Sequence, residues 1–357
     1  MSNERKSNIE LLRLISMFMI ILFHCVEYGI MRTDFPDAYV RWYSGTGFNK
    51  IFSAFFTCGG DTGVGVFFII TGYFLYNVYE KPFPVKIIRK LYFYGWINAI
   101  VMFFLYINGH HAFSIIQILR SILLPVSGST WWFASVYVLL LITYPQINKC
   151  LNQIDNKSFY LGLVLIMWGA WYVGGKILDV FYYRVLRGFF YFILGAYFAK
   201  YGIKSRKMSG LLWGVSWCLF FIVSFLIGII VGANYNSIKI IMLVNLLKLI
   251  RRTILGPISA IGCFGFFLKS SIKHSITINK LAATTFGVYL FHDAPGIKVL
   301  LWDSIFNVSG KPYDKVWFPI YMISIAFIIL VAGMLIDCSQ SIIDKHLCEF
   351  IGRKRDR

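Results

Sequence analysis

Long apolar segments recur about ten times along the chain, and they constrain its fold more than any other feature of the sequence. About 20 apolar residues in a helix are needed to cross the ~30 Å hydrocarbon layer of a bilayer. Of the 357 residues, 58% are hydrophobic and only 14% are charged, whereas about a quarter of the residues of soluble proteins are charged. A soluble domain of this size could not bury so many apolar side chains around one core. The sequence therefore predicts an all-α polytopic membrane protein.

Ten segments are long and apolar enough to be transmembrane helices. They cover residues 9–30, 61–78, 91–107, 131–147, 159–173, 184–199, 211–231, 238–268, 281–301 and 316–336. Residues 112–126 are also apolar, but Arg120 and Pro125 favour a short interfacial or re-entrant helix there.

The segment 238–268 is too long for one crossing and contains three cations. Lys248, Arg251 and Arg252 interrupt its apolar run. We expect an amphipathic segment that leads into a span over residues 254–268.

The distribution of Lys and Arg predicts the orientation of the chain. With the N-terminus in the cytoplasm, twenty of these residues lie in cytoplasmic segments and eight on the opposite side. Cytoplasmic loops carry the excess of Lys and Arg in membrane proteins. We therefore expect both termini inside, a single membrane domain over residues 1–357, a cytoplasmic tail from about residue 338, and a location in the plasma or inner membrane.

Composition also restricts the partners of the chain. The net charge of +19 comes from residues between apolar runs, which is typical of loops that contact membrane lipids rather than of a nucleic-acid-binding surface. The seven cysteines form no CxxC pair and have no regular spacing. This pattern indicates neither a disulfide framework nor a metal site.

Ionisable residues within membrane spans are costly and are functional candidates by default. His24 lies about two-thirds along the first span, and Arg13 precedes it by eleven residues, which is roughly 16 Å along a helix. An Arg that reaches the interface and a His bonded to a neighbouring helix would explain both residues equally well. Glu27 follows His24 by three residues, so it could orient the imidazole or simply lie at the outer interface.

A second group of cations precedes the third span. Lys86 and Arg89 are three residues apart and share a helix face, so the pair could hold a phosphate group. Anchoring to anionic lipid explains the same pair and is, taken alone, the stronger interpretation. In the ninth span, His292 has a structural role at least as readily as a functional one, and on a continuous helix Asp293 points elsewhere.

Several segments resemble the acyltransferase-3 family of membrane acyltransferases. Residues 8–16 and 22–24 resemble its first span, in which ten positions separate a basic residue from a His, as they do Arg13 from His24. The sequence GVGVFFIITGYF at residues 63–74 is similar to the second-span signature. It departs from that signature at Gly65, where many members have an acidic residue, and at Thr71, where Ser is usual.

Three further motifs follow in the order of the family. Lys86 to Arg89 resemble its Arg-x-x-Arg motif, with Lys in the first position. Residues 131–148 are similar to its fourth-span pattern, especially to that of members that modify surface polysaccharides, and residues 286–292 resemble its ninth-span motif. The similarities extend over nearly the whole chain.

This resemblance implies transfer of an acyl group, usually acetyl, from cytoplasmic acyl-CoA (acetyl-CoA) to a hydroxyl of an extracytoplasmic glycan, without a metal. It implies that His24 acts as a base or carries the acyl group, and that the phosphates of CoA bind Arg13, Lys86 and Arg89. A His with a pKa near 6.5 can remove a proton from a sugar hydroxyl near neutral pH. Possible supporting residues are Glu27, Thr71, Trp132 and His292.

A secondary transporter or flippase for a glycan or a lipid-linked precursor is the alternative function. It would also use an intramembrane His and Arg. Only an enzyme that binds CoA requires the cytoplasmic pair Lys86 and Arg89 in line with Arg13, and this favours the acyltransferase. A family member that has become a membrane sensor is a third possibility, against which the presence of both Arg13 and His24 argues.

Overall fold

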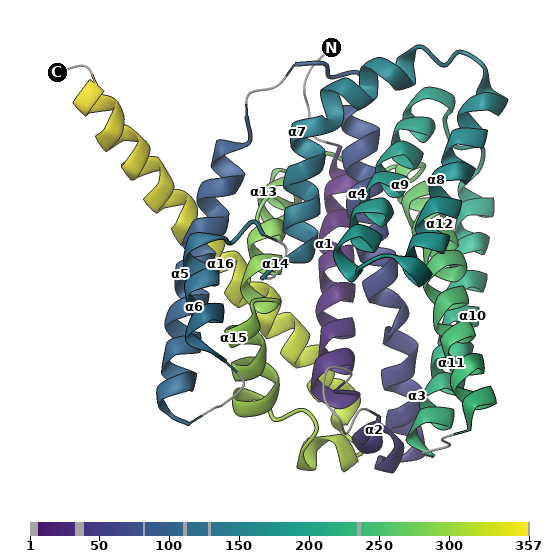
Figure 1. The fold of residues 1–357 in the computed structure, drawn as a ribbon, viewed down its shortest axis with the longest axis vertical. Coiled ribbons are helices and arrows are strands. Elements are labelled where there is room, and N and C mark those ends of the chain that lie inside the picture. The colour runs from purple at the N-terminus through teal and green to yellow at the C-terminus, as the bar shows by residue number, and fades with distance from the viewer. Residues whose placement is uncertain are drawn as a thin grey trace.

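The chain forms a bundle of helices, most of which run up or down a common axis (Figure 1). The computed structural model describes residues 6–32, 39–80, 83–109, 113–127, 130–233 and 237–355, and these contain helices and loops but no strand. The expected all-α fold is therefore confirmed. The helices are α1 (Ser7–His24), α2 (Val40–Ser44), α3 (Gly47–Phe56), α4 (Cys58–Leu75), α5 (Val85–Ile107), α6 (Ile115–Leu123), α7 (Trp132–Asn152), α8 (Lys157–Ile177), α9 (Val180–Tyr201), α10 (Arg206–Gly232), α11 (Ile238–Ile250), α12 (Gly256–Leu268), α13 (Ile276–Ala282), α14 (Thr285–His292), α15 (Pro295–Val299) and α16 (Phe318–Arg355). Shorter elements are the π-helical segments η1 (Cys25–Ile30), η2 (Arg251–Leu255) and η3 (Leu300–Ile305) and the 3-10 helix η4 (Lys311–Asp314).

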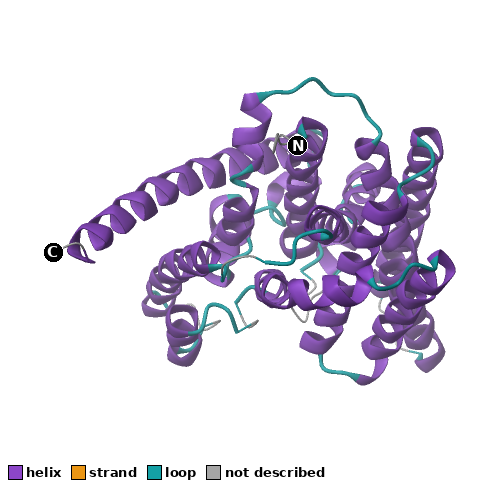
Figure 2. Cartoon of the chain, turned by 90° about the horizontal axis from the view of Figure 1, so that it is seen from above, coloured by secondary structure: helices purple, strands orange, loops and turns teal. Residues whose placement is uncertain are grey.

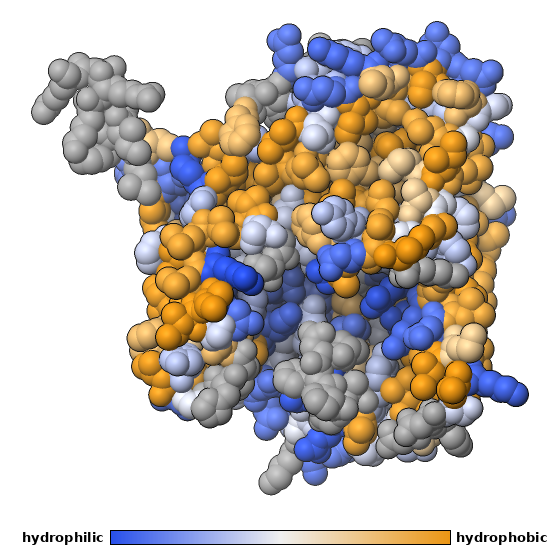
Figure 3. Space-filling model, in the orientation of Figure 1, coloured by the Kyte–Doolittle hydropathy of each residue, from blue (hydrophilic) through white to orange (hydrophobic). Residues whose placement is uncertain are grey.

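The protein is a multi-pass membrane protein. Five helical stretches in the described residues are long and apolar enough to cross a bilayer: Ser7–Ile30, Gly47–Leu75, Val85–Ile107, Arg206–Gly232 and Phe318–His346. Large apolar side chains are exposed on the outside of the bundle, for example Ile166, Leu211 and Phe327. Figure 3 shows this apolar surface as a broad orange region, with hydrophilic side chains gathered at the end where the N-terminus lies. The count of ten spans remains a prediction.

Glycines bring α4 into backbone contact with its neighbours at the centre of the bundle. A Cβ atom added at Gly72 would overlap the carbonyl oxygen of Phe192 in α9, and one added at Gly195 would overlap that of Ile69 in α4. Small residues allow such close approach between membrane helices. The glycines of the second-span signature therefore fix α4 against α9.

The segment expected to be an amphipathic helix followed by a span is one continuous helical stretch. Residues 238–268 form α11, η2 and α12 without a break. Lys248, Arg251 and Arg252 do not interrupt it, because Lys248 lies three residues before Arg251 and four before Arg252, so that the three side chains lie on one helix face. That face lines an internal cavity, so these cations do not mark a membrane interface.

The expected ninth span, residues 281–301, is not one helix. It consists of the end of α13, α14, α15 and the start of η3. Pro295 occupies the first turn of α15, and Ala294 before it has an extended backbone (φ −65°, ψ 132°). A residue before proline is disfavoured in the helical conformation, so α14 ends at His292.

Two other expectations concern short and terminal segments. Residues 115–123 form the short helix α6, which packs on α5 through a hydrogen bond from the Ser121 hydroxyl to the Gly95 carbonyl. This agrees with the expectation of a short helix between the third and fourth spans. The last span and the described part of the expected tail form one helix, α16, whose C-terminal end projects away from the bundle (Figure 2).

Candidate active site

A cavity of about 1280 Å³ lies inside the bundle, between α1, α4, α5, α7, α9, α11 and α14. Its wall on α1 and the following segment η1 includes Arg13, Met17, Ile20, His24 and Glu27. These residues are three or four positions apart and form one helix face. The cavity therefore follows α1 from Arg13 to His24, about 16 Å at 1.5 Å per residue, and continues along η1 to Glu27.

The two ends of the cavity differ in the elements that form them. The end beside the start of α1 is lined by Arg13, Thr71, Lys86, Lys90 and Tyr137, and we call it the N-terminal end. The opposite end is lined by Glu27, Asp61, Arg184, Arg187, Lys248, Arg251 and Arg252, and we call it the arginine end. The helix α4 runs antiparallel to α1, since a Cβ added at Gly60 would meet Phe23 and one at Gly63 would meet Ile20.

His24 lies in the cavity wall between these two ends, where its ring nitrogen Nδ1 is 3.0 Å from Nε2 of His292. The Nδ1 atom of His292 is 2.7 Å from the carbonyl oxygen of Val288. A carbonyl oxygen only accepts hydrogen bonds, so this Nδ1 carries the proton of His292. Nε2 of neutral His292 is then an acceptor, and the proton of His24 lies on its Nδ1. The lone pair of His24 is therefore on Nε2, the ring atom that can act as a base.

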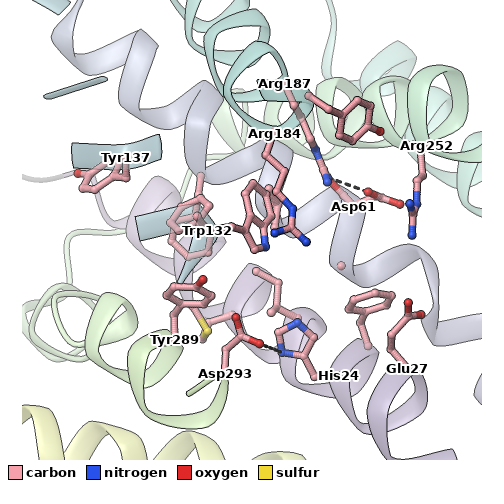
Figure 4. A pocket seen from close by; sticks show the side chains of 18 of the residues that line it. His24, Glu27, Asp61, Trp132, Tyr137, Arg184, Arg187, Arg252, Tyr289 and Asp293 are labelled. Carbon is pink, nitrogen blue, oxygen red and sulfur yellow. Dashed lines mark hydrogen bonds and ion pairs between the residues drawn. The ribbon is translucent and has the colours of Figure 1, made fainter. Parts of the chain in front are cut away.

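Asp293 also contacts His24, contrary to the expectation that it points elsewhere. Its Oδ1 atom is 3.8 Å from Nδ1 of His24, and Figure 4 shows the two side chains facing each other. The expectation was wrong because α14 ends at His292, so Asp293 does not follow the helical direction. The sequence Ala294-Pro295, which disfavours a continuing helix, was the signal that could have identified this contact.

Cations form much of the N-terminal end. Arg13 is paired with Glu10 in the same helix (Nη1 to Oε1, 3.2 Å) and its side chain remains 29% exposed. Lys90 is paired with Asp337 of α16 at 2.7 Å and is buried. Lys86 is exposed at the cavity and forms no ion pair within the described residues.

Arg89 lies apart from the cavity. Its Nε and Nη2 atoms donate to the two carboxylate oxygens of Asp344 in α16, at 2.7 and 3.0 Å, and it is not part of the cavity lining. The expectation that Lys86 and Arg89 face one phosphate does not match this geometry. A step of three residues leaves the two side chains about 60° apart around the helix axis, and Arg89 lies on the side of α5 that meets Asp344 of α16. Lys90, not Arg89, lines the cavity together with Lys86.

The remaining candidates line the same cavity as His24. The hydroxyl of Thr71 donates to the Phe67 carbonyl at 2.8 Å, which orients the side chain. Trp132, the first residue of α7, lies with its ring 5.1 Å from the guanidinium of Arg184. Glu27 lies at the arginine end.

The arginine end is the part of the site that the sequence reasoning missed. Arg187 forms a buried ion pair with Asp61 (Nη2 to Oδ1, 2.7 Å), drawn as a dashed line in Figure 4. Arg251 donates from Nη1 to the Ser224 hydroxyl at 3.2 Å. The available signal was the presence of these cations within apolar segments, where a charged side chain is rare.

A comparison with known families decides the class of this site. The sequence model of a family described as an acyltransferase domain matches residues 6–337, a range that includes every residue of the cavity lining. The chain belongs to the acyltransferase-3 family. No curated protein and no solved structure matches it.

In this acyltransferase, the family motifs converge on one cavity. The first-span residues Arg13 and His24, the second-span residue Thr71, the fourth-span residue Trp132 and the pre-third-span residue Lys86 all line it. An acyltransferase must bring a donor and an acceptor together at one catalytic group. A cavity with a charged region at each end and a histidine between them can do so.

Proposed function

We propose that this acyltransferase transfers an acyl group, acetyl in the simplest case, from cytoplasmic acyl-CoA to a hydroxyl of an extracytoplasmic glycan. The observation that carries the proposal is the position of His24, between the two ends of a cavity that follows a transmembrane helix. A donor can then enter from one end and an acceptor from the other. The cell membrane, plasma or inner, is the location that gives access to both.

The N-terminal end is suited to the phosphates of CoA. Arg13, Lys86 and Lys90 line it, and Arg and Lys form charge-assisted hydrogen bonds with phosphate. From Arg13 to His24 the cavity wall rises by about 16 Å. The pantetheine arm of CoA is long and unbranched, so it can place the thioester beside His24.

The hydrogen-bond network supports a separate role for each nitrogen of His24 during transfer. Nε2 accepts the proton of the acceptor hydroxyl while the hydroxyl oxygen attacks the thioester carbonyl. The tetrahedral intermediate then collapses, the carbon–sulfur bond breaks, and the CoA thiolate leaves and takes up the proton held by His24. In between, His24 is an imidazolium, which His292 stabilises by accepting from Nδ1 and Asp293 by its negative charge. General-base assistance of this kind contributes about 10²–10⁴-fold in rate.

The acceptor side of the proposal rests on the family motifs. Residues 131–148, which include Trp132, resemble the pattern of members that modify surface polysaccharides. The alternative, a transporter or flippase, receives less support because the family match is to an acyltransferase domain. A transporter would move its substrate without consuming acyl-CoA, whereas membranes that contain an acyltransferase consume acetyl-CoA when an acceptor is present.

Calorimetric titration of acetyl-CoA into the purified full-length protein tests the donor site. Each charge-assisted bond to phosphate is worth about 1.5–3 kcal/mol, so Arg13→Gln and Lys86→Gln should each weaken binding roughly ten- to a hundredfold. Lys207→Gln, at an exposed position outside the cavity, is the control and should bind normally. Unchanged affinity in both cavity variants would leave lipid anchoring as the better account of these cations.

Arg89→Gln tests whether Arg89 binds acyl-CoA, as the sequence motif implies, or stabilises the fold, as its contacts in the structure imply. The motif predicts weaker binding of acyl-CoA, whereas the bidentate pair with Asp344 predicts unchanged affinity and a lower unfolding temperature. Asp344→Asn should lower the unfolding temperature by a similar amount, and the double variant by little more, because the two residues share one interaction.

A further inference from the structure

The arginine end of the cavity holds more positive charge than its own carboxylates can balance. Among the residues that the structure describes, five cations line it, namely Arg184, Arg187, Lys248, Arg251 and Arg252, against the two carboxylates Glu27 and Asp61. Adding Asp293 beside His24 still leaves the cations two in excess. A charged side chain within a bilayer is costly unless it is paired. The excess therefore has to be explained.

Two of these cations have partners within the protein. Arg187 is bound to Asp61 at 2.7 Å and both side chains are about nine-tenths buried. Arg251 donates to Ser224 and lies over the ring of Phe220, 5.3 Å from its centroid. These contacts hold α9 against α4 and η2 against α10, so both arginines have a structural role.

Three cations remain that form no ion pair within the described residues. Arg184 contacts the ring of Trp132, while Lys248 and Arg252 line the cavity four residues apart on one helix face. In the part of the chain that the structure describes, Asp61, Glu27 and Asp293 are near these cations, but none of their carboxylate oxygens is within ion-pair distance of the three. Figure 4 shows Arg184 and Arg252 on either side of the Arg187–Asp61 pair, in the wall of the cavity.

Lipid anchoring does not explain these three residues. Cations that bind anionic lipid lie in cytoplasmic loops, whereas Arg184 lies near the start of α9 and Lys248 and Arg252 within the helical stretch 238–268. All three side chains line an internal cavity. In the predicted orientation they belong to the half of the membrane away from the cytoplasm, where Lys and Arg are depleted.

We propose that Arg184, Lys248 and Arg252 bind an oxyanion carried by the acceptor, so that the acceptor is an anionic glycan. This inference rests on the proposed function, which assigns this end of the cavity to the acceptor. The guanidinium groups of Arg184 and Arg252 match the planar geometry of a carboxylate or a phosphate group, and Lys248 adds a point charge. The anionic group binds at the arginine end while a neighbouring hydroxyl reaches Nε2 of His24.

Two kinds of sugar substituent supply an oxyanion, and small probes separate them. Glucose 1-phosphate carries a phosphate, glucuronate carries a carboxylate, and glucose is the neutral control. Calorimetry with the full-length protein in detergent should show at least one anionic sugar binding about tenfold or more tightly than glucose, as expected for one or more charge-assisted bonds. The tighter of the two anions identifies the group that the natural acceptor carries.

Substitutions then test whether the anionic sugar binds at the cluster of Arg184, Lys248 and Arg252. Arg184→Gln and Arg252→Gln should each weaken the anionic sugar about tenfold or more, without changing the weak binding of glucose. Arg252→Lys should retain part of the affinity. Lys239→Gln, on α11 but outside the cavity lining, is the matched control and should bind normally. The unfolding temperature of each variant verifies that it is folded.

The affinity for acetyl-CoA, measured in the same variants, separates this inference from the proposed function. It should be unchanged in Arg184→Gln and Arg252→Gln. An equal loss of affinity for acetyl-CoA would assign the cluster to the donor and overturn the inference. Anionic sugars that bind no better than glucose, or equal losses in the Lys239→Gln control, would also overturn it. Neither of these two results affects the donor site or the role of His24.

Discussion

Replacement of His292 by leucine should slow acyl transfer without weakening the binding of acyl-CoA. In the structure His292 Nε2 accepts the proton of His24 Nδ1 at 3.0 Å, and this bond strengthens when His24 becomes an imidazolium in the transition state. A hydrogen bond to a charged group is worth about 1.5–3 kcal/mol. Loss of this amount from the transition state reduces kcat about 10- to 150-fold. The KM for acyl-CoA should change little, because the phosphates bind elsewhere.

His292→Gln is the matched variant, since the glutamine carbonyl can accept near the position of the imidazole Nε2. It should recover a substantial part of kcat, whereas a purely structural role of His292 would make the two variants differ only in stability. The assay is transfer of labelled acetyl from acetyl-CoA by purified protein, with unfolding temperatures measured in parallel. A folded His292→Leu variant with wild-type kcat would refute the proposed role of the hydrogen bond between His24 and His292.

Three further predictions concern packing, a buried ion pair and orientation. Asp61→Asn leaves Arg187 buried without its partner and should cost about 3–5 kcal/mol of stability, measured by chemical unfolding; a loss under ~1 kcal/mol would contradict the burial of the pair. Gly72→Ala pushes α4 away from α9 and should lower the stability by about 1–3 kcal/mol. Gly162→Ala is the control: no atom lies within 4 Å of the new Cβ, so this variant should be as stable as the wild type or more stable. Equal unfolding temperatures of the two variants would contradict the close packing. A single cysteine at position 87, in a chain without its native cysteines, should react with an impermeant reagent only from the cytoplasmic side. If it is labelled from outside in intact cells, the orientation is the opposite of the predicted one, and cytoplasmic acyl-CoA cannot be the donor.

The sequence predicted the all-α membrane fold correctly, and several of its candidate residues line the cavity. Apolar runs of membrane length leave few alternatives to transmembrane helices, and the spacing from Arg13 to His24 places both on one face of α1. That face could be recognised from the sequence because it depends only on helical periodicity.

Features that depend on contacts between distant segments could not be predicted in this way. Arg89 is bound by Asp344, 255 residues later in the chain, and nothing near Arg89 indicates this partner. Arg184 and Arg252 can be recognised as parts of one site only once α9 and the helical stretch 238–268 are seen to line the same cavity. The contact of Asp293 with His24 has a local cause, because Pro295 disfavours a continuing helix and α14 ends at His292.

His24 is the proposed catalytic base for acylation of a surface glycan. Mass spectrometry of surface polysaccharide tests this role most directly, in cells that express the wild-type protein, the His24→Ala variant at equal membrane abundance, or neither. We expect an acyl substituent on the glycan of wild-type cells that is absent from both of the others. The same acyl content in His24→Ala cells as in wild-type cells would contradict the role of His24, and the same content in cells without the protein would contradict the proposed function.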